Sequence, residues 1–176
     1  MKLFKKFKNK NILYNFLLGK EKNYDDKYIH EIWKYDDLEL EYNHNYIQWL
    51  FPLKEKSKHN IFAPIIEDKE RYQNRSIQLN VLMSFNVMLN FYGFKYQDNK
   101  VIKNDNFLEK IDNWLRPNNH NFLRITRILK SLVLFDLKNE AIAFLNILLD
   151  LKEEYSEKIS DKTVKYWIEA TEIIEV

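Results

Sequence analysis

The chain has 176 residues, which suits one domain, and its 28 basic and 26 acidic residues leave a net charge of +2, a balance that does not imply a nucleic-acid partner. Hydrophobic residues make up 45% and aromatic residues 15%, so a sizeable core can form and a disordered chain is excluded. Only 2 glycines and 3 prolines occur, far fewer than sheet proteins with many tight turns require. Because cysteine is absent, disulfides and thiolate metal sites are excluded. The composition therefore predicts an all-helical protein.

Residues 1–23 form a basic lead-in, which begins MKLFKKFKNK and runs into a short apolar stretch. We interpret it as the approach to a short helix rather than as a secretion signal, because Asn15 interrupts the apolar run and no small-residue cleavage site follows. In a second reading, Phe4 and Phe7 among the lysines touch an anionic membrane surface. No apolar run approaches the ~20 residues of a membrane span, so we expect a cytoplasmic chain.

The next predicted elements are two helices. The first, at 28–35, places its apolar residues on one face. Asp36 or Asp37 can cap the second, which is expected to continue to Leu50. Pro52 then discourages further helix.

A long helix is predicted at 68–92, and three more follow it. Apolar side chains recur along one face of the long helix at steps of three and four: Val81, Leu82, Phe85, Met88, Leu89 and Tyr92. Gly93 suits the position just past its end. A connection follows at 96–106, and it allows only a short strand at 100–102. Asn118 or Asn119 can cap the next helix, and the last two predicted helices cover 138–155 and 160–174. The pattern predicts a single compact bundle of about six to eight helices.

The segment 40–51 carries the first candidate site residues. If it is one helix up to its last residue, Glu41, His44 and Gln48 fall on one face. A solvated helix face usually carries Lys and Glu, whereas this face is polar without being simply charged. Trp49 lies beside it and would supply an aromatic wall.

A second polar stripe follows the predicted helix at 120–131, where His120, Arg124, Arg127 and Ser131 share one face. Two arginines one turn apart can grip a carboxylate or phosphate with forked donors. A histidine at a helix start lies near the positive end of the helix dipole, where anions are favoured.

Two interpretations of these stripes stay open. In the first, they join into one pocket that binds an anionic group through the arginines, and its ligand-binding candidates are Glu41, His44, Gln48, Trp49, His120, Arg124 and Arg127. In the second, Arg124 or Arg127 pairs with Glu41 inside the fold and locks two helices together, since paired charges are the usual way to keep arginine partly buried.

Other chemical signals are sparse. The four histidines at positions 30, 44, 59 and 120 form no H-E-x-x-H pair, so no metal site is predicted. Phosphate-binding loops, dinucleotide fingerprints and nucleophile elbows do not occur, so we assign no catalytic residue and no cofactor. The sequence favours a non-enzymatic role.

Four blocks of sequence, in order, resemble a known family. They are YIHEIWKYDDLELEYNHNYIQWLFPL at 28–53, SKHNIFAP at 57–64, FYG at 91–93 and HNFLRITRILKSL at 120–132. In these strings the chain resembles the conserved domain of the opioid growth factor receptor family, over roughly residues 24–150. The resemblance implies an all-helical domain, named for an animal protein that binds methionine-enkephalin and restrains cell growth. Members in animals are placed at the nucleus or associated membranes.

The resemblance sets the expected organisation and function. We expect the conserved helical domain at 24–155 and a C-terminal helix at 156–176 that packs on the same domain. The expected function is non-catalytic binding of a peptide or small anionic ligand. The alternatives are an enzyme acting on a phosphate or nucleotide substrate, with His44 or His120 as acid/base, and a nucleic-acid-binding module that uses the N-terminal lysines and Arg116, Arg124 and Arg127.

Overall fold

The computed structural model describes residues 11–57 and 60–172. Contacts within the chain group it into two compact units, Met1–Asn80 (unit 1) and Val81–Val176 (unit 2). The predicted basic lead-in, with Phe4, Phe7 and its lysines, lies mostly outside the described residues. The domain boundaries predicted near residues 23 and 155 stay predictions.

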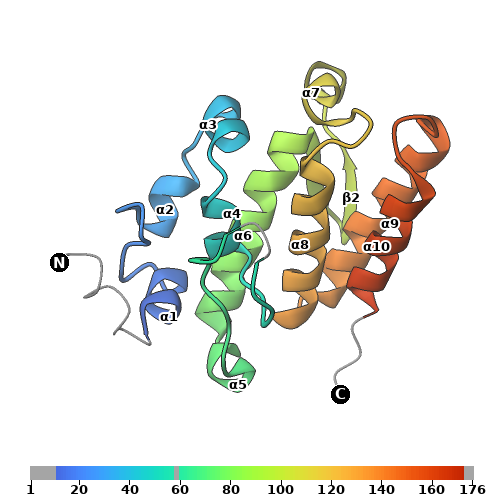
Figure 1. The fold of residues 1–176 in the computed structure, drawn as a ribbon. Helices are drawn as coiled ribbons and strands as arrows, with labels where there is room; N and C mark the ends of the chain where they lie inside the picture. The colour runs from blue at the N-terminus through green and yellow to red at the C-terminus, as the bar shows by residue number, and fades with distance from the viewer. Residues whose placement is uncertain (1–10, 58–59, 173–176) are drawn as a thin grey trace. The chain divides into compact units, whose positions relative to one another are not determined.

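Helices dominate the described residues, as predicted (Figure 1). Unit 1 contains α1 (Ile12–Leu17), α2 (Ile29–Ile32), α3 (Asp37–Tyr42), α4 (Tyr46–Leu50) and α5 (Lys69–Tyr72). The boundary between the units falls inside α6 (Arg75–Tyr92). Unit 2 continues with β1 (Phe94–Gln97), β2 (Lys100–Lys103), α7 (Phe107–Trp114), α8 (Asn121–Leu134), α9 (Lys138–Glu154) and α10 (Asp161–Thr171). The ten helices of the described residues exceed the predicted six to eight, because two predicted helices are each divided in two and α7 was not predicted.

A two-stranded antiparallel hairpin corrects the all-helical prediction. Phe94 pairs with Lys103, and Gln97 pairs with Lys100. The turn between the strands is Asp98–Asn99, and both residues have positive φ, 52° and 60°. A two-residue turn of this kind matches the twist of the paired strands, and Asp and Asn tolerate it better than most residues. The short strand expected at 100–102 is therefore real, but its partner strand was missed.

The helix predicted to reach Leu50 without a break is wrong at 43–45, where α3 ends and α4 has not yet begun. Its start is confirmed: the Asp36 carboxylate accepts from Glu39 N at 2.8 Å, and Glu39 accepts from Asp36 N at 3.0 Å. At the other end, the Asn43 side chain donates to the Glu39 carbonyl at 2.9 Å. Asparagine competes in this way with the helical hydrogen bonds of the main chain, and the run of Asn43, His44 and Asn45 ends α3.

The long helix predicted at 68–92 is likewise divided, into α5 and α6. The Asn74 side chain accepts from Ser76 N at 2.9 Å and starts α6 afresh. Gly93 ends α6 as predicted, with φ of +85°. A Cβ at Gly93 would lie 3.0 Å from the Phe107 Cα, so the position also allows α7 to approach closely.

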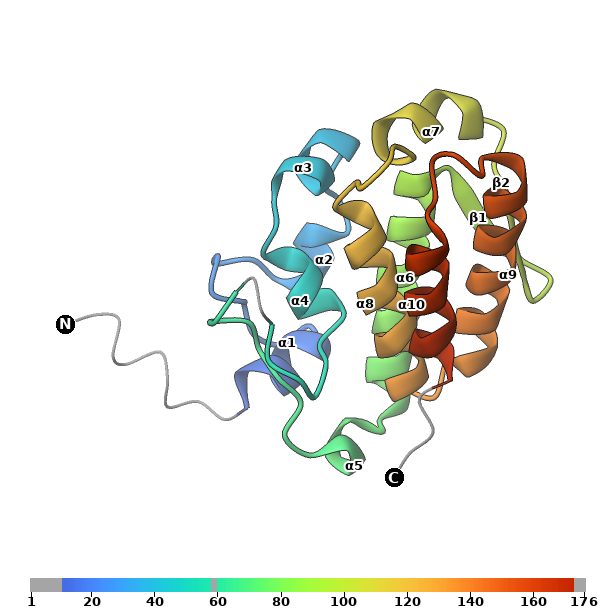
Figure 2. The same ribbon diagram turned by 45° about the vertical axis from the view of Figure 1, so that its right-hand side comes forward.

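The core of unit 2 lies among α8, α9 and α10, which contact one another, while β2 packs on α9 (Figure 2). An aromatic cluster surrounds Phe144, whose ring lies 5.5 Å from Phe85 and 6.3 Å from both Tyr92 and Phe94. The buried indole of Trp114 donates to the Tyr92 carbonyl at 3.1 Å. The three predicted C-terminal helices are confirmed, with small shifts at their ends.

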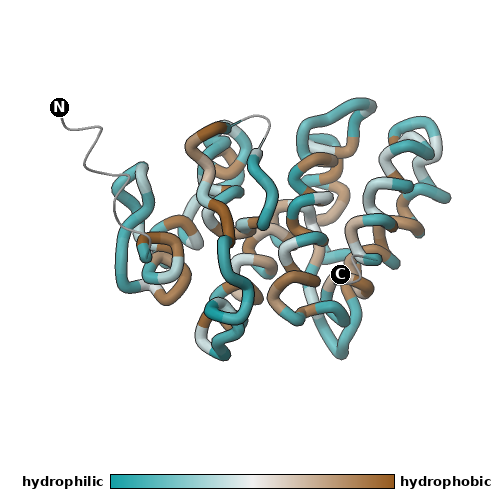
Figure 3. Tube along the Cα trace, turned by 60° about the horizontal axis from the view of Figure 1, so that its bottom comes forward, coloured by the Kyte–Doolittle hydropathy of each residue, from teal (hydrophilic) through white to brown (hydrophobic). Residues whose placement is uncertain are grey.

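Unit 1 has a smaller core, centred on α1 and α4. The Trp49 ring lies edge-on to Phe16 at 5.1 Å and to Tyr24 at 4.9 Å. Polar and apolar residues alternate along the chain, as expected for elements that each bury one face (Figure 3). Within the described ranges, no helix is long and apolar enough to cross a membrane.

Candidate functional site

The break between α3 and α4 separates the residues predicted to share one helical face. Glu41 is half-buried on α3, and His44 is exposed in the turn. Gln48 is buried on α4, and in the amide orientation that gives both its oxygen and its nitrogen a partner, the nitrogen donates to the carbonyls of His44 at 3.2 Å and Asn45 at 2.9 Å. These bonds keep the Gln48 amide against the first turn of its own helix.

Trp49 is a core residue, only 3% exposed. Its ring packs edge-on against the ring of Tyr24, which is only partly buried. Burial raises the pKa of the Tyr24 hydroxyl, so this group stays neutral and can donate a hydrogen bond at neutral pH.

His44 borders a small polar hollow of about 290 Å³ in unit 1. Asn23 shapes this hollow by accepting from the main-chain N–H groups of Asp25 and Lys27, both at 3.0 Å. Tyr35 also borders it, and burial, followed by the negative charges of nearby carboxylates, raises its pKa. Asp25 and Lys27 both line the hollow, so its lining carries no excess of negative charge.

In unit 2, α8 carries the predicted arginines. Arg124 is only 5% exposed, and its Nη1 donates to the Asn121 side-chain oxygen at 3.2 Å. The Tyr92 hydroxyl donates to the same oxygen at 3.5 Å. Arg127 is half-buried one turn later, and His120 is exposed at the start of α8. Arg124 is thus a buried cation held by an amide; whether α8 meets the residues of the first stripe stays a prediction.

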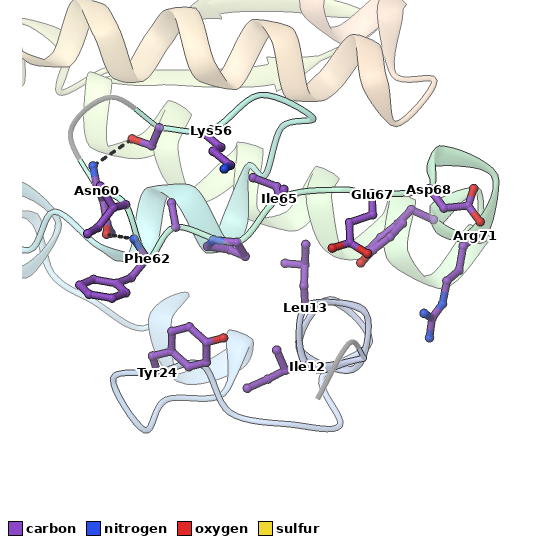
Figure 4. Close-up of a pocket in the computed structure, with 15 residues that line it drawn as sticks. Ile12, Leu13, Tyr24, Lys56, Asn60, Phe62, Ile65, Glu67, Asp68 and Arg71 are labelled. Carbon is purple, nitrogen blue, oxygen red and sulfur yellow. Dashed lines mark hydrogen bonds between the residues drawn. The ribbon is translucent and has the colours of Figure 1, made fainter. Parts of the chain in front are cut away.

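A larger pocket, which we call the loop pocket, lies in unit 1 and was missed by the sequence analysis (Figure 4). It has a volume of about 630 Å³, within the usual range for ligand sites. Aromatic, aliphatic and charged side chains line it: Ile12, Leu13, Tyr24, Lys56, Ser57, Asn60, Ile61, Phe62, Ala63, Pro64, Ile65, Glu67, Asp68, Arg71 and Tyr72.

Asn60 organises the wall of the loop pocket. Its side-chain oxygen accepts from Phe62 N at 3.0 Å, and its carbonyl accepts from Ala63 N at 3.1 Å. The Ser57 hydroxyl in turn accepts from Asn60 N at 3.2 Å. The turn presents two bulky apolar side chains to solvent, Ile61 at 84% exposure and Phe62 at 53%. Adjacent exposed apolar side chains beside a hollow are typical of interaction sites.

Arg71 is directed away from the middle of the loop pocket (Figure 4). Its Nη2 donates to the Asn11 side chain at 2.6 Å, and its guanidinium lies 4.7 Å from the centre of the Tyr14 ring. The Tyr14 ring in turn meets Tyr72 edge-on at 5.7 Å. These contacts hold the Arg71 guanidinium outside the middle of the pocket.

A signal for the loop pocket was present in the sequence. The SKHNIFAP block carried part of the family resemblance, and Ser57, Asn60, Ala63 and Pro64 from it line the pocket. Two bulky apolar residues in a polar loop, with no helical or strand period, are themselves a cue for surface recognition. The described residues contain no cluster of three or more His, Cys, Asp or Glu side chains placed to hold a metal.

Comparison with known proteins identifies a family that matches the chain. The model of the opioid growth factor receptor (OGFr) conserved region matches residues 5–173. The chain is 39% identical over 140 residues to opioid growth factor receptor-like protein 1 of Mus musculus, covering 73% of this chain and 30% of the relative. It is 40% identical over 98 residues to the opioid growth factor receptor of Homo sapiens, covering 53% of this chain and 14% of the relative. The chain thus spans less than a third of the length of these relatives, and no solved structure matches it.

Proposed function

We propose that this chain, which belongs to the family of the OGFr conserved region, is a non-catalytic peptide-binding domain whose ligand enters the loop pocket of unit 1. The relatives' names describe a receptor for a growth factor, and binding without chemistry is the part of that role that a single conserved region can carry.

The observation that carries the proposal is the pairing of a hollow with exposed apolar side chains. The pocket volume of about 630 Å³ accommodates a few side chains of a bound segment. Ile61 and Phe62 at its rim would lose contact with water when a ligand covers them, and this burial favours binding.

The architecture of the wall supports the same reading. The hydrogen bonds of Asn60 hold the loop in place before any ligand arrives. A preformed site loses less conformational entropy on binding, so a short peptide can be held without a large interface.

The test is a binding titration of the full chain with fluorescein-labelled, terminally capped tetrapeptides that contain two bulky apolar residues. Phe62→Ser should weaken binding at least fivefold, because the rim loses its apolar contact. The matched control is Leu38→Ser on α3, another exposed apolar residue of unit 1 outside the loop pocket. Equal loss in both variants, or none in either, would contradict the proposal.

A second candidate is a small anionic ligand at α8, and the buried cation of Arg124 supports it. Arg127 follows one turn later and could complete a two-arginine grip on phosphate. Millimolar phosphate should then raise the thermal midpoint of the chain, because a ligand that binds only the folded state stabilises it. Arg127→Gln should abolish the rise, whereas Lys130→Gln, on the same helix, should keep it. A rise of the same size in both variants would remove this candidate.

A further inference from the structure

We infer that the loop pocket selects peptide segments in which an aromatic side chain and a basic side chain lie a few residues apart. This inference rests on the proposed function, and it adds the chemical class of the ligand and the orientation of the bound peptide in the loop pocket.

One end of the loop pocket is aromatic. Tyr24 and Phe62 lie together there (Figure 4). Tyr24 is braced edge-on by the buried Trp49 ring at 4.9 Å, so its position is fixed by the core of unit 1. Phe62 is 53% exposed and has area to lose on contact. Edge-to-face contacts between rings add to the gain from burial, so this end favours an aromatic ligand side chain.

The middle of the pocket is aliphatic. Leu13 and Ile12 from α1 form one side, and Ile65 faces them across the space (Figure 4). The main chain beside Ile65 is fixed, because Ile66 N donates to the Leu53 carbonyl at 2.9 Å. Such a lining accepts the apolar stems of ligand side chains but offers no partner to a charge, so a ligand charge must lie at an end.

The opposite end is acidic. The Glu67 carboxylate points into the pocket, and Asp68 follows it (Figure 4). Burial is the main cause that raises the pKa of Tyr72 on this wall; Arg71 opposes the shift, and Glu67 and Asp68 add to it. Glu67 and Asp68 thus act on the Tyr72 hydroxyl, against the opposing charge of Arg71. Because Arg71 is drawn toward Asn11 and Tyr14, its guanidinium does not occupy the position that a ligand cation would take beside Glu67.

Lys56 favours one orientation of the bound peptide over the reverse one. It is exposed and lies beside Ile65, apart from the acidic end (Figure 4). A ligand cation is attracted by Glu67 and repelled by Lys56, so a segment with an aromatic and a basic residue has one favourable orientation. A segment with an acidic residue in place of the basic one meets Glu67 unfavourably.

The experiment compares three capped, fluorescein-labelled peptides on the full chain at low and moderate salt. The first contains Phe and Arg separated by two alanines, the second replaces Arg with Gln, and the third replaces Arg with Glu. The expected order of affinity is Arg, then Gln, then Glu, with at least a fivefold step between Arg and Gln. Added salt should shrink that step, because exposed charges are screened.

Variants of the chain identify the group responsible. Glu67→Gln should remove the preference for Arg over Gln, and Lys56→Gln should increase the affinity for the Arg peptide. Glu153→Gln, an exposed carboxylate of unit 2, is the matched control and should change nothing. If the three peptides bind equally, or if Glu67→Gln keeps the preference, the charge selection is overturned while peptide binding stands. If no peptide binds the unaltered chain at millimolar concentration, the proposed function fails as well.

Discussion

The two units of this chain differ in the length of their helices and in how those helices are stabilised. In unit 1 the helices α1 to α5 contain four to six residues each, and long connections separate them. In unit 2 the helices α7 to α10 contain 8 to 17 residues, and α8, α9 and α10 bury a continuous apolar core. Helices of one turn are not stable alone, so unit 1 depends on side-chain hydrogen bonds at its turns.

We therefore expect folding stability to depend mainly on unit 2 and ligand recognition to depend mainly on unit 1. Loops carry binding residues more often than the elements that they connect, and the loop pocket is formed largely by the loop after α4. Changes in the core of unit 2 should therefore cost folding free energy. Changes in the loop of unit 1 should cost affinity instead.

The largest expected effect is loss of the aromatic centre of unit 2. Phe144→Ala removes a fully buried ring that contacts Phe85, Tyr92 and Phe94 and leaves a cavity. The free energy of unfolding should fall by about 3–5 kcal/mol, the usual cost for a buried phenylalanine. Chemical denaturation measures it, with Ile142→Ala, at an exposed site on the same helix, as the control. A loss below 1 kcal/mol would show that this cluster does not hold unit 2 together.

The next effect is at the end of α6. Gly93→Ala places a Cβ at positive φ and 3.0 Å from the Phe107 Cα. The positive φ alone costs about 1–2 kcal/mol, and the close approach requires α7 to shift as well. The denaturation midpoint should fall, and hydrogen exchange should rise first in α7. Unchanged stability would mean that α7 can move without cost.

A smaller effect on stability is expected in unit 1. Asn60→Ala removes the side-chain oxygen that accepts from Phe62 N, an exposed bond worth about 0.5–1.5 kcal/mol. Peptide affinity should fall more than stability does, because the loop would lose its preformed shape. Asn86→Ala, which removes an exposed side-chain bond to the Leu82 carbonyl in unit 2, is the control. If both variants bind peptide equally well, Asn60 does not shape the site.

The smallest effect is a dependence on pH at the joint between α9 and α10. Lys152 Nζ lies 2.8 Å from the Asp161 carboxylate and donates to the Ile159 carbonyl at 2.7 Å. The hydrogen bond and charge of Lys152 lower the pKa of Asp161 below its ordinary value of 3.8. A carboxyl group with a lowered pKa in the folded state adds stability above its unfolded pKa, and this is lost as the pH falls through the folded pKa.

Lys152→Met should remove this pH dependence. Denaturation midpoints measured between about pH 2 and pH 6 should differ between the unaltered chain and the variant by an amount that shrinks as the pH falls. A constant difference over this range would show that Lys152 acts only through the carbonyls of Ser156 and Ile159.

The sequence predicted the long amphipathic elements and failed where side chains compete with the main chain. The pattern behind α8, α9 and α10 has a period that only a helix satisfies, and Gly93 and Asp36 marked helix ends through conformational and capping preferences. The breaks at Asn43 and Asn74 depend on single hydrogen bonds that no periodicity reveals. The Asp98–Asn99 turn was missed because its positive φ values are carried without glycine.

The candidate site was the least predictable part. Gln48 was selected because a polar face stood out on an assumed continuous helix, but its amide bonds to the main chain at the start of α4. The loop pocket joins α1 and Tyr24 to the loop after α4 and to α5, which follow much later in the sequence. No local pattern brings Leu13, Phe62 and Glu67 together, since only the packing of unit 1 does so.

The central claim is that peptide recognition belongs to the loop pocket of unit 1. The most direct test is a nuclear magnetic resonance titration of the isotope-labelled full chain with the capped peptide that contains Phe and Arg, following every backbone amide. We expect the largest chemical-shift changes at 60–72 and at Leu13 and Tyr24. Changes centred on α8, around Arg124 and Arg127, with the loop pocket unaffected, would contradict it.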